Sequence, residues 1–310
     1  MYGLKRIDIM KPIKLFVAIL SVCFAAFTTG YSSNDKTNAL LWKVSGNGLE
    51  KPSYILGTLH VAPKAKLDSI PGAMQMLESC ERVVGELVMS DAMAQISIIQ
   101  QAGMMPTDTT YEMLYTEDEY QKVSNGIKEC TGVGLDHVSM FKPGMIRTSV
   151  SLFMCRKYFP DFDVNEAMDN YVQQYAYSVG KDVIGLETID DQIDALYRSS
   201  SLKRQAELLL CLFEYFEETW KSSEKLIDAY NSADLAAIEA ISNDVEDPCP
   251  STQTELDALN KNRNDNWIKK LPEIMSEKSS FIAVGAAHLV GESGLLTQLE
   301  KLGYKIEPVK

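Results

Sequence analysis

Six short apolar runs, most of them near the two ends of the chain, constrain the fold more than any other feature of the sequence. They occupy residues 40–44, 53–59, 82–88, 181–187, 281–285 and 304–309. Each has the length of one buried strand, and the turn formers between the first two runs predict an antiparallel hairpin. Helical sequence at 70–79 and 291–302 separates other runs, so strands and helices alternate. This pattern predicts an α/β fold with a mixed central sheet and flanking helices.

The middle of the chain is predominantly helical in its periodicity. Apolar spacing predicts helices over residues 91–102, 117–130, 142–158, 164–179, 190–197, 203–230, 233–243 and 252–275. The clearest breaks are residues 161–165 and 244–250, the second of which contains two prolines. We therefore expect one compact α/β domain over residues 39–310 with a large helical insertion at about 90–275.

The first thirty residues have the organisation of a secretory signal peptide. A basic start is followed by an apolar run over 15–27 and by small residues up to Gly30, and Met10 is an alternative start. A retained membrane anchor is the rival interpretation, but about 13 apolar residues are too few to span a bilayer. Lipidation at Cys23 is disfavoured by the bulk of Val22. Export to the periplasm, the cell envelope or the exterior is predicted.

The charge of the chain excludes some classes of partner. It has 43 acidic and 30 basic residues and a net charge of −13, which becomes −16 when a leader with four basic residues and one acidic residue is removed. Nucleic acids and anionic membrane surfaces repel such a surface. We expect no nucleic-acid partner, and membrane contact only through a retained N-terminal segment. A peptide or a small molecule remains as the substrate.

Five cysteines remain after removal of the leader, and export would place them in an oxidising compartment. Their order makes Cys130–Cys155 and Cys211–Cys249 plausible disulfides, but connectivity does not follow from sequence. The odd number leaves at least one free thiol. No C-x-x-C spacing indicates a zinc knuckle or a redox motif.

Two copies of a Gly-x-x-His motif follow strand-like runs at opposite ends of the chain. They are Gly57-Thr-Leu-His60 and Gly285-Ala-Ala-His288, and they use two of only three histidines. Because ligands of α/β sheets collect beyond the carboxyl ends of strands, we expect the two motifs to converge at one site. His137 has no such setting, and a structural role is expected for it.

Glutamates at the ends of two other runs add to this predicted site. Glu86 interrupts the apolar run 82–88, and Glu187 closes the run 181–187. A buried carboxylate is costly unless it is paired or bound to metal. Two histidines with one or two carboxylates match the ligands of zinc, manganese or cobalt, and a carboxylate could act as general base on bound water. The alternative for each glutamate is a position facing solvent or capping a helix.

A polar cluster interrupts the last long helical stretch. In Asn262-Arg-Asn-Asp-Asn-Trp267, the side chains of Arg263 and Asn264 could face the strand ends and stabilise an oxyanion or polarise a carbonyl. A solvated helix face is the alternative.

Taken in order, these motifs resemble the TraB/GumN family, which is related to the Tiki proteins and to an erythromycin-esterase-like and ChaN-like superfamily. The resemblance covers about residues 39–310 and rests on Leu41-Trp42 and on residues 54–60, 82–88, 185–192, 262–267 and 285–296. It implies a mixed α/β fold and metal-dependent hydrolysis, because Tiki relatives are manganese- or cobalt-dependent proteases acting near the amino termini of substrates. Carried over by position, it implies a metal site of His60, Glu86 and His288, supported by Arg263, Asn264 and Glu187.

Three functional hypotheses follow. The first is an exported metal-dependent hydrolase, a peptidase, with Glu86, Arg263 and Asn264 as catalytic residues. The second is an esterase-like hydrolase that uses a histidine as general base without a metal. The third is a non-catalytic module that binds haem, iron or a small ligand, with tyrosines of 171–177 lining its pocket.

Overall fold

The computed structural model describes residues 38–155, 159, 167–242, 244 and 247–310. The predicted signal peptide and the break expected at 161–165 lie outside these residues. Within them, no helix is both long enough and apolar enough to cross a membrane.

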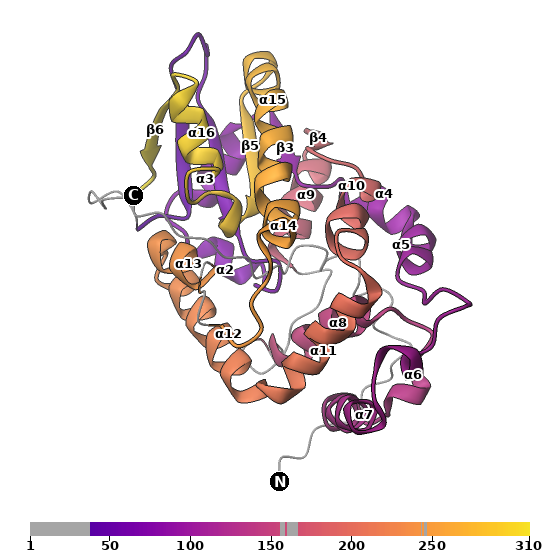
Figure 1. Ribbon diagram of the computed structural model, residues 1–310. Coiled ribbons are helices and arrows are strands. Elements are labelled where there is room, and N and C mark those ends of the chain that lie inside the picture. The colour runs from indigo at the N-terminus through magenta and orange to yellow at the C-terminus, as the bar shows by residue number, and fades with distance from the viewer. Residues whose placement is uncertain (1–37, 156–158, 160–166, 243, 245–246) are drawn as a thin grey trace.

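All six predicted strands form, and they belong to one sheet (Figure 1). The strands are β1 (Leu41–Ser45), β2 (Ser53–Thr58), β3 (Arg82–Gly85), β4 (Asp182–Gly185), β5 (Ser280–Gly285) and β6 (Lys305–Pro308). Their order is β4-β3-β5-β2-β1-β6. β4, β3, β5 and β2 are parallel, whereas β1 runs antiparallel to β2 and to β6. The predicted mixed sheet and the first hairpin are therefore confirmed.

The four parallel strands bring their carboxyl ends to the same edge of the sheet. In register, Thr58 lies beside Gly285, and Gly85 lies beside Gly185. β3 and β4 end at these last two glycines, which is earlier than the apolar runs suggested. The two glutamates that follow these strands therefore stand just beyond the sheet edge.

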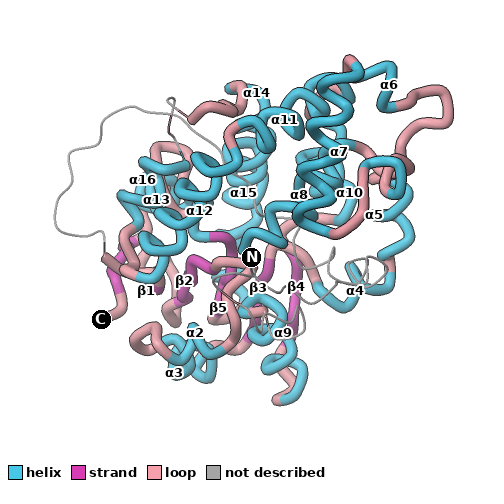
Figure 2. Tube along the Cα trace, turned by 90° about the horizontal axis from the view of Figure 1, so that it is seen from below, coloured by secondary structure: helices cyan, strands magenta, loops and turns pink. Residues whose placement is uncertain are grey.

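Helices cover both faces of the sheet. Figure 2 shows one layer with α2 (Ala65–Asp68), α3 (Ala73–Ser79) and α9 (Met168–Ser178), and an opposite layer with α13 (Leu235–Ser242), α15 (Asn262–Glu277) and α16 (Leu295–Lys301). The main core lies between these layers, and its strand residues include the fully buried Ile55, Leu56, Val84, Phe281 and Ile282. The helices expected at 70–79 and 291–302 begin later than predicted, at Ala73 and Leu295.

Helices from the middle of the chain form a second apolar core besides the one at the sheet. The remaining helices of this region are α4 (Met89–Ala94), α5 (Ile96–Ala102), α6 (Tyr111–Leu114), α7 (Glu117–Thr131), α8 (Pro143–Cys155), α10 (Ile189–Ile193), α11 (Leu202–Glu214), α12 (Phe216–Asn231) and α14 (Gln253–Leu256). α6, α7, α8 and α11 share a second apolar cluster that contains Val123, Ile127, Val150, Leu209 and Leu212. One long helical prediction was wrong in its continuity, because residues 203–230 divide at Tyr215. The helix predicted over 252–275 is confirmed, since the chain is helical from Gln253 to Glu277 with a π-helical segment at Asp257–Lys261.

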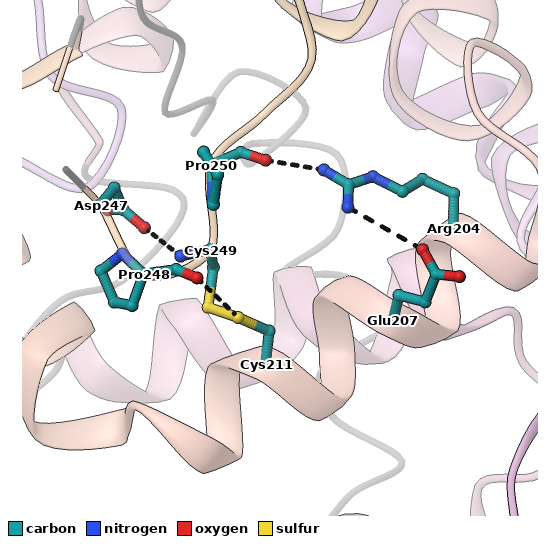
Figure 3. The surroundings of a disulfide bond; sticks show 7 residues. All are labelled: Arg204, Glu207, Cys211, Asp247, Pro248, Cys249 and Pro250. Carbon is teal, nitrogen blue, oxygen red and sulfur yellow. Dashed lines mark hydrogen bonds and ion pairs between the residues drawn. A yellow bond between two sulfur atoms is a disulfide. The ribbon is translucent and has the colours of Figure 1, made fainter. Parts of the chain in front are cut away.

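A disulfide joins α11 to the loop that leads into α14 (Figure 3). Cys211 is bonded to Cys249, as one of the two predicted pairings proposed. Arg204 reinforces the same attachment, because its guanidinium donates to the Pro250 carbonyl at 2.7 Å. Cys130 is a buried free thiol, so the other predicted pairing is not formed. The disulfide fixes the chain segment that precedes the helix carrying the polar cluster.

Candidate active site

The two motif histidines and Glu86 converge at the carboxyl ends of three adjacent strands. His60 follows β2, Glu86 follows β3, and His288 ends the 3-10 turn that follows β5. All three are buried. Glu86 Oε1 lies 3.6 Å from His60 Nε2 and 3.8 Å from His288 Nε2. The structure thus brings residues from both ends of the chain to one point.

Gly285 keeps a space open between these three side chains. A Cβ atom on this residue would lie 3.2 Å from His60 Nε2, 3.4 Å from Glu86 Oε1 and 3.5 Å from His288 Cδ2. Its φ of −53° is open to any residue, so the glycine provides room and not a special backbone conformation. In the other motif, a Cβ on Gly57 would lie 2.8 Å from Leu289 Cδ1, so that glycine allows close packing.

His60 is oriented by Asp169, which comes from α9. His60 Nδ1 donates to Asp169 Oδ2 at 2.9 Å, and Thr58 holds the other oxygen through a hydrogen bond of 2.7 Å. His60 Nε2 is buried without a hydrogen-bond partner. Burial lowers the pKa of His60, but the charges of Asp169 and Glu86 outweigh it and raise this pKa to about 9.

His288 is held in the opposite way, as a neutral imidazole with a defined tautomer. The Asn264 amide nitrogen donates to two carbonyls, those of His288 and Ser293. Its oxygen must therefore accept from His288 Nδ1, at 2.8 Å. The proton on Nδ1 leaves Nε2 with its lone pair, which accepts from Arg263 at 2.9 Å. Burial and the neighbouring Arg263 charge lower the pKa of His288 to about 3.

Arg263 is the electrostatic centre of the site. Its Nε and Nη2 donate to Glu187 at 3.0 and 2.6 Å, and Nη2 also donates to Glu86 at 2.5 Å. Nη1 donates to the Leu259 carbonyl at 3.1 Å and to His288. All five N–H donors of the guanidinium therefore have acceptors. A solvated position for Arg263 was the alternative hypothesis, and the residue is instead buried.

The two carboxylates lie in different surroundings. Burial raises the pKa of the Glu86 carboxyl, but Arg263 and the two imidazoles together lower it by a larger amount. The pKa of Glu86 is therefore below its ordinary value. The Gly285 N–H also donates to Glu86 Oε1 at 2.8 Å. Burial raises the pKa of Glu187 in spite of its pairing with Arg263. Trp267 Nε1 donates to the same carboxylate at 3.1 Å, so neither glutamate faces solvent.

The donors match the ligands of a divalent ion by type and by their separations from Glu86 Oε1, while His288 Nε2 accepts from Arg263 in this structure. Imidazole nitrogen and carboxylate oxygen are ligands of zinc, manganese and cobalt. Ligand bonds of about 2.1 Å at tetrahedral angles place ligand atoms about 3.4 Å apart, close to the separations from Glu86 Oε1 given above. The unpartnered His60 Nε2 and the space beside Gly285 agree with this fit. Even so, no group of three His, Cys, Asp or Glu in the described chain forms a ready-made metal site.

Sequence reasoning missed Asp169, which comes from a helix in which a single polar residue carries no motif. It included Gln192 in the family-like stretch 185–192 but gave it no role; the Gln192 amide lies 3.5 Å from Glu86 Oε2. His137 lies on the surface beside Asp136, away from the site. The two cavities that border Arg263 are not lined by any tyrosine of 171–177.

Fold and site together describe an α/β protein with histidines and glutamates gathered at its parallel strand ends. The family model for the TraB/PrgY/gumN family matches residues 40–308, so the chain belongs to this family. The predicted resemblance to the TraB/GumN family is confirmed.

Curated relatives carry metalloprotease names. The chain is 22% identical to a "Metalloprotease TIKI homolog" of Amphimedon queenslandica, over 94% of this chain and 66% of the relative. It is 22% identical to "Metalloprotease TIKI2" of Danio rerio, over 89% of this chain and 62% of the relative. It is 23% identical to "Metalloprotease TIKI1" of Xenopus tropicalis, over 87% of this chain and 61% of the relative. The chain thus spans just under two thirds of the length of these relatives. No solved structure matches it.

Proposed function

We propose that this protein is an exported, metal-dependent hydrolase that cleaves peptide bonds. The observation that carries the proposal is the convergence of His60, Glu86 and His288 on the space beside Gly285, with His60 Nε2 lacking a hydrogen-bond partner. The relatives' names support the peptidase class. The signal-like sequence of residues 1–30 and the Cys211–Cys249 disulfide support export, because disulfides persist in oxidising compartments.

In this proposal, His60, Glu86 and His288 would hold a manganese, cobalt or zinc ion, and His288 Nε2 would exchange the hydrogen bond that it accepts from Arg263 for the ion. Such an ion, when bound, acidifies water and polarises a carbonyl. Asp169 and Asn264 fix the orientation of the two imidazoles, as carboxylates and amides do behind metal-binding histidines.

Glu86 and Arg263 complete the site. Glu86 Oε1 faces both imidazoles, so Glu86 would serve either as the third ligand of the ion or, when the two imidazoles alone hold the ion, as the acceptor of a proton from water. Arg263 is a positioning residue, because its Nη2 holds Glu86 and its remaining N–H groups are donated to Glu187, Leu259 and His288. Glu187 fixes the guanidinium through two hydrogen bonds. Asn264 is a positioning residue, because its amide is occupied by His288 and Ser293.

A peptide-library cleavage assay with added manganese, cobalt or zinc tests this proposal. Wild type should cleave peptides only with metal, and Glu86→Gln should reduce the rate by at least 10²-fold. Glu129→Gln, on an exposed face of α7, is the matched control and should keep the wild-type rate. Absence of metal-stimulated cleavage by wild type would overturn the proposal and favour a binding module.

A second candidate function is hydrolysis without a metal. It is favoured by the His60–Asp169 pair, in which a carboxylate orients an imidazole whose Nε2 has no hydrogen-bond partner. Because the pKa of His60 is raised to about 9, His60 would act as a base only at alkaline pH. Ester hydrolysis that survives a chelator and is abolished by His60→Ala would establish it. Loss of all activity in the chelator, restored by manganese, would exclude it.

A further inference from the structure

A small cavity lies beside the two histidines, between the ends of β2 and β5 and the helices α12 and α13. Its volume is about 60 Å³. Leu226, Tyr230 and Ile238 from the two helices line it together with His60 and His288, and the neutral polar side chains of Thr58, Ser242 and Asn260 also border it. We call it the Ile238 pocket. It opens directly onto the imidazoles that the proposed chemistry uses.

The Ile238 pocket has no free charge to offer a ligand. Its charged lining residues are His60 and Arg263, and Asp169 and Glu86 already balance the charge of His60. The guanidinium has no N–H left to donate, and Glu86 and Glu187 balance its charge. The Tyr230 hydroxyl is also engaged, since it donates to the Gly57 carbonyl at 3.1 Å. A charged side chain entering this pocket would lose its hydration without gaining a counter-ion.

A second cavity also borders Arg263, and it differs from the Ile238 pocket in its size and in the charge of its lining. It is larger, about 440 Å³, and is lined by acidic and basic side chains, including Asp191, Asp194, Lys269 and Lys270. Neither His60 nor His288 lines it. Of the two cavities, therefore, only the Ile238 pocket lies where a group next to the reacting bond would be held.

We propose that the Ile238 pocket receives the substrate side chain adjacent to the scissile peptide bond and selects short aliphatic side chains. This proposal rests on the proposed function. About 60 Å³ is room for a few water molecules, which suits a short aliphatic group but not an aromatic ring. Aspartate, lysine and phenylalanine are disfavoured at this position, the first two by desolvation and the third by size.

A matched peptide series tests the assignment. Peptides that differ only in one residue next to the mapped cleavage site carry valine, phenylalanine, aspartate or lysine there. Wild type should show a kcat/KM for valine at least 10-fold above the others, since one methylene in an apolar pocket changes selectivity by about 10–200-fold. Ile238→Ala should raise the phenylalanine-to-valine ratio at least 10-fold, and Ile238→Val should raise it less. Ile241→Ala, on the same helix but outside the lining, is the control. An unchanged ratio in Ile238→Ala would overturn the proposal.

A binding measurement separates this proposal from the proposed function. Saturation-transfer NMR with the N-acetyl methylamides of valine, phenylalanine and aspartate reports binding without cleavage. Preferential valine binding that Ile238→Ala shifts toward phenylalanine supports the pocket even if no peptide is cleaved. If peptides are cleaved but Ile238→Ala changes neither the kcat/KM ratio nor the binding preference, the hydrolase proposal is supported and the assignment of the Ile238 pocket is overturned. Neither cleavage nor binding would overturn both.

Discussion

Replacing Arg263 by methionine should destabilise this protein far more than the loss of an exposed charge. The side chains of Arg263, Glu86 and Glu187 are only 7%, 5% and 4% exposed. Arg263→Met would leave two buried carboxylates close together without their counter-ion. Removing one partner of a buried ion pair costs about 3–5 kcal/mol. Protonation of Glu187, whose pKa burial already raises, limits the added cost of the second carboxylate. We therefore expect a loss of about 3–5 kcal/mol in the free energy of unfolding.

Urea unfolding with linear extrapolation measures this loss. Lys269→Met removes a positive charge from the exposed face of the same helix and should change stability by no more than about 0.5 kcal/mol. Glu187→Gln should cost less in the Arg263→Met background than in wild type, with a coupling of about 1–3 kcal/mol. If Arg263→Met were as mild as Lys269→Met, or if the two site substitutions were additive, the account of Arg263 as the counter-ion of both carboxylates would be refuted.

Three further predictions follow from the disulfide and from the surroundings of His60. Replacing Cys211 and Cys249 together by serine should cost about 4 kcal/mol of unfolding free energy in the chain-entropy treatment, because the bridge spans 38 residues; equal stability of the oxidised and reduced proteins in urea would contradict this. Asp169→Asn should weaken manganese binding 10–100-fold in calorimetry by releasing the His60 imidazole, and unchanged affinity would show that Asp169 does not orient it. Gly285→Ala should abolish metal binding with a melting temperature close to wild type, because its Cβ enters the space between the ligands; retained binding would place the ion elsewhere.

Much of the sheet could be predicted because its strands carry a local signal. The six apolar runs are short and bounded by turn formers, and all six became strands. The strand order was beyond prediction, since β5 is inserted between β3 and β2 through contacts that no local pattern encodes. The break at Tyr215 was missed for a related reason. Neither glycine nor proline marks it, and the backbone there leaves the helical region with φ −119° and ψ 40°.

The centre of the site could be inferred because two kinds of signal coincide at strand ends. His60 and His288 repeat one spacing, and Glu86 places a charge in an apolar run. Parallel strands then bring such positions to one edge. Asp169 and Ile238 gave no comparable signal. Each is an ordinary residue of an amphipathic helix, and its position at the site depends on how that helix packs against the sheet.

Metal titration of the purified protein tests the central claim most directly. Calorimetry with manganese, cobalt and zinc, together with elemental analysis, should show about one bound ion per chain in wild type. His60→Ala and His288→Ala should each lose it, whereas His137→Ala, which alters an exposed histidine outside the site, should retain it. A wild-type protein that binds no divalent ion, or one whose binding is indifferent to His60 and His288, would contradict the account.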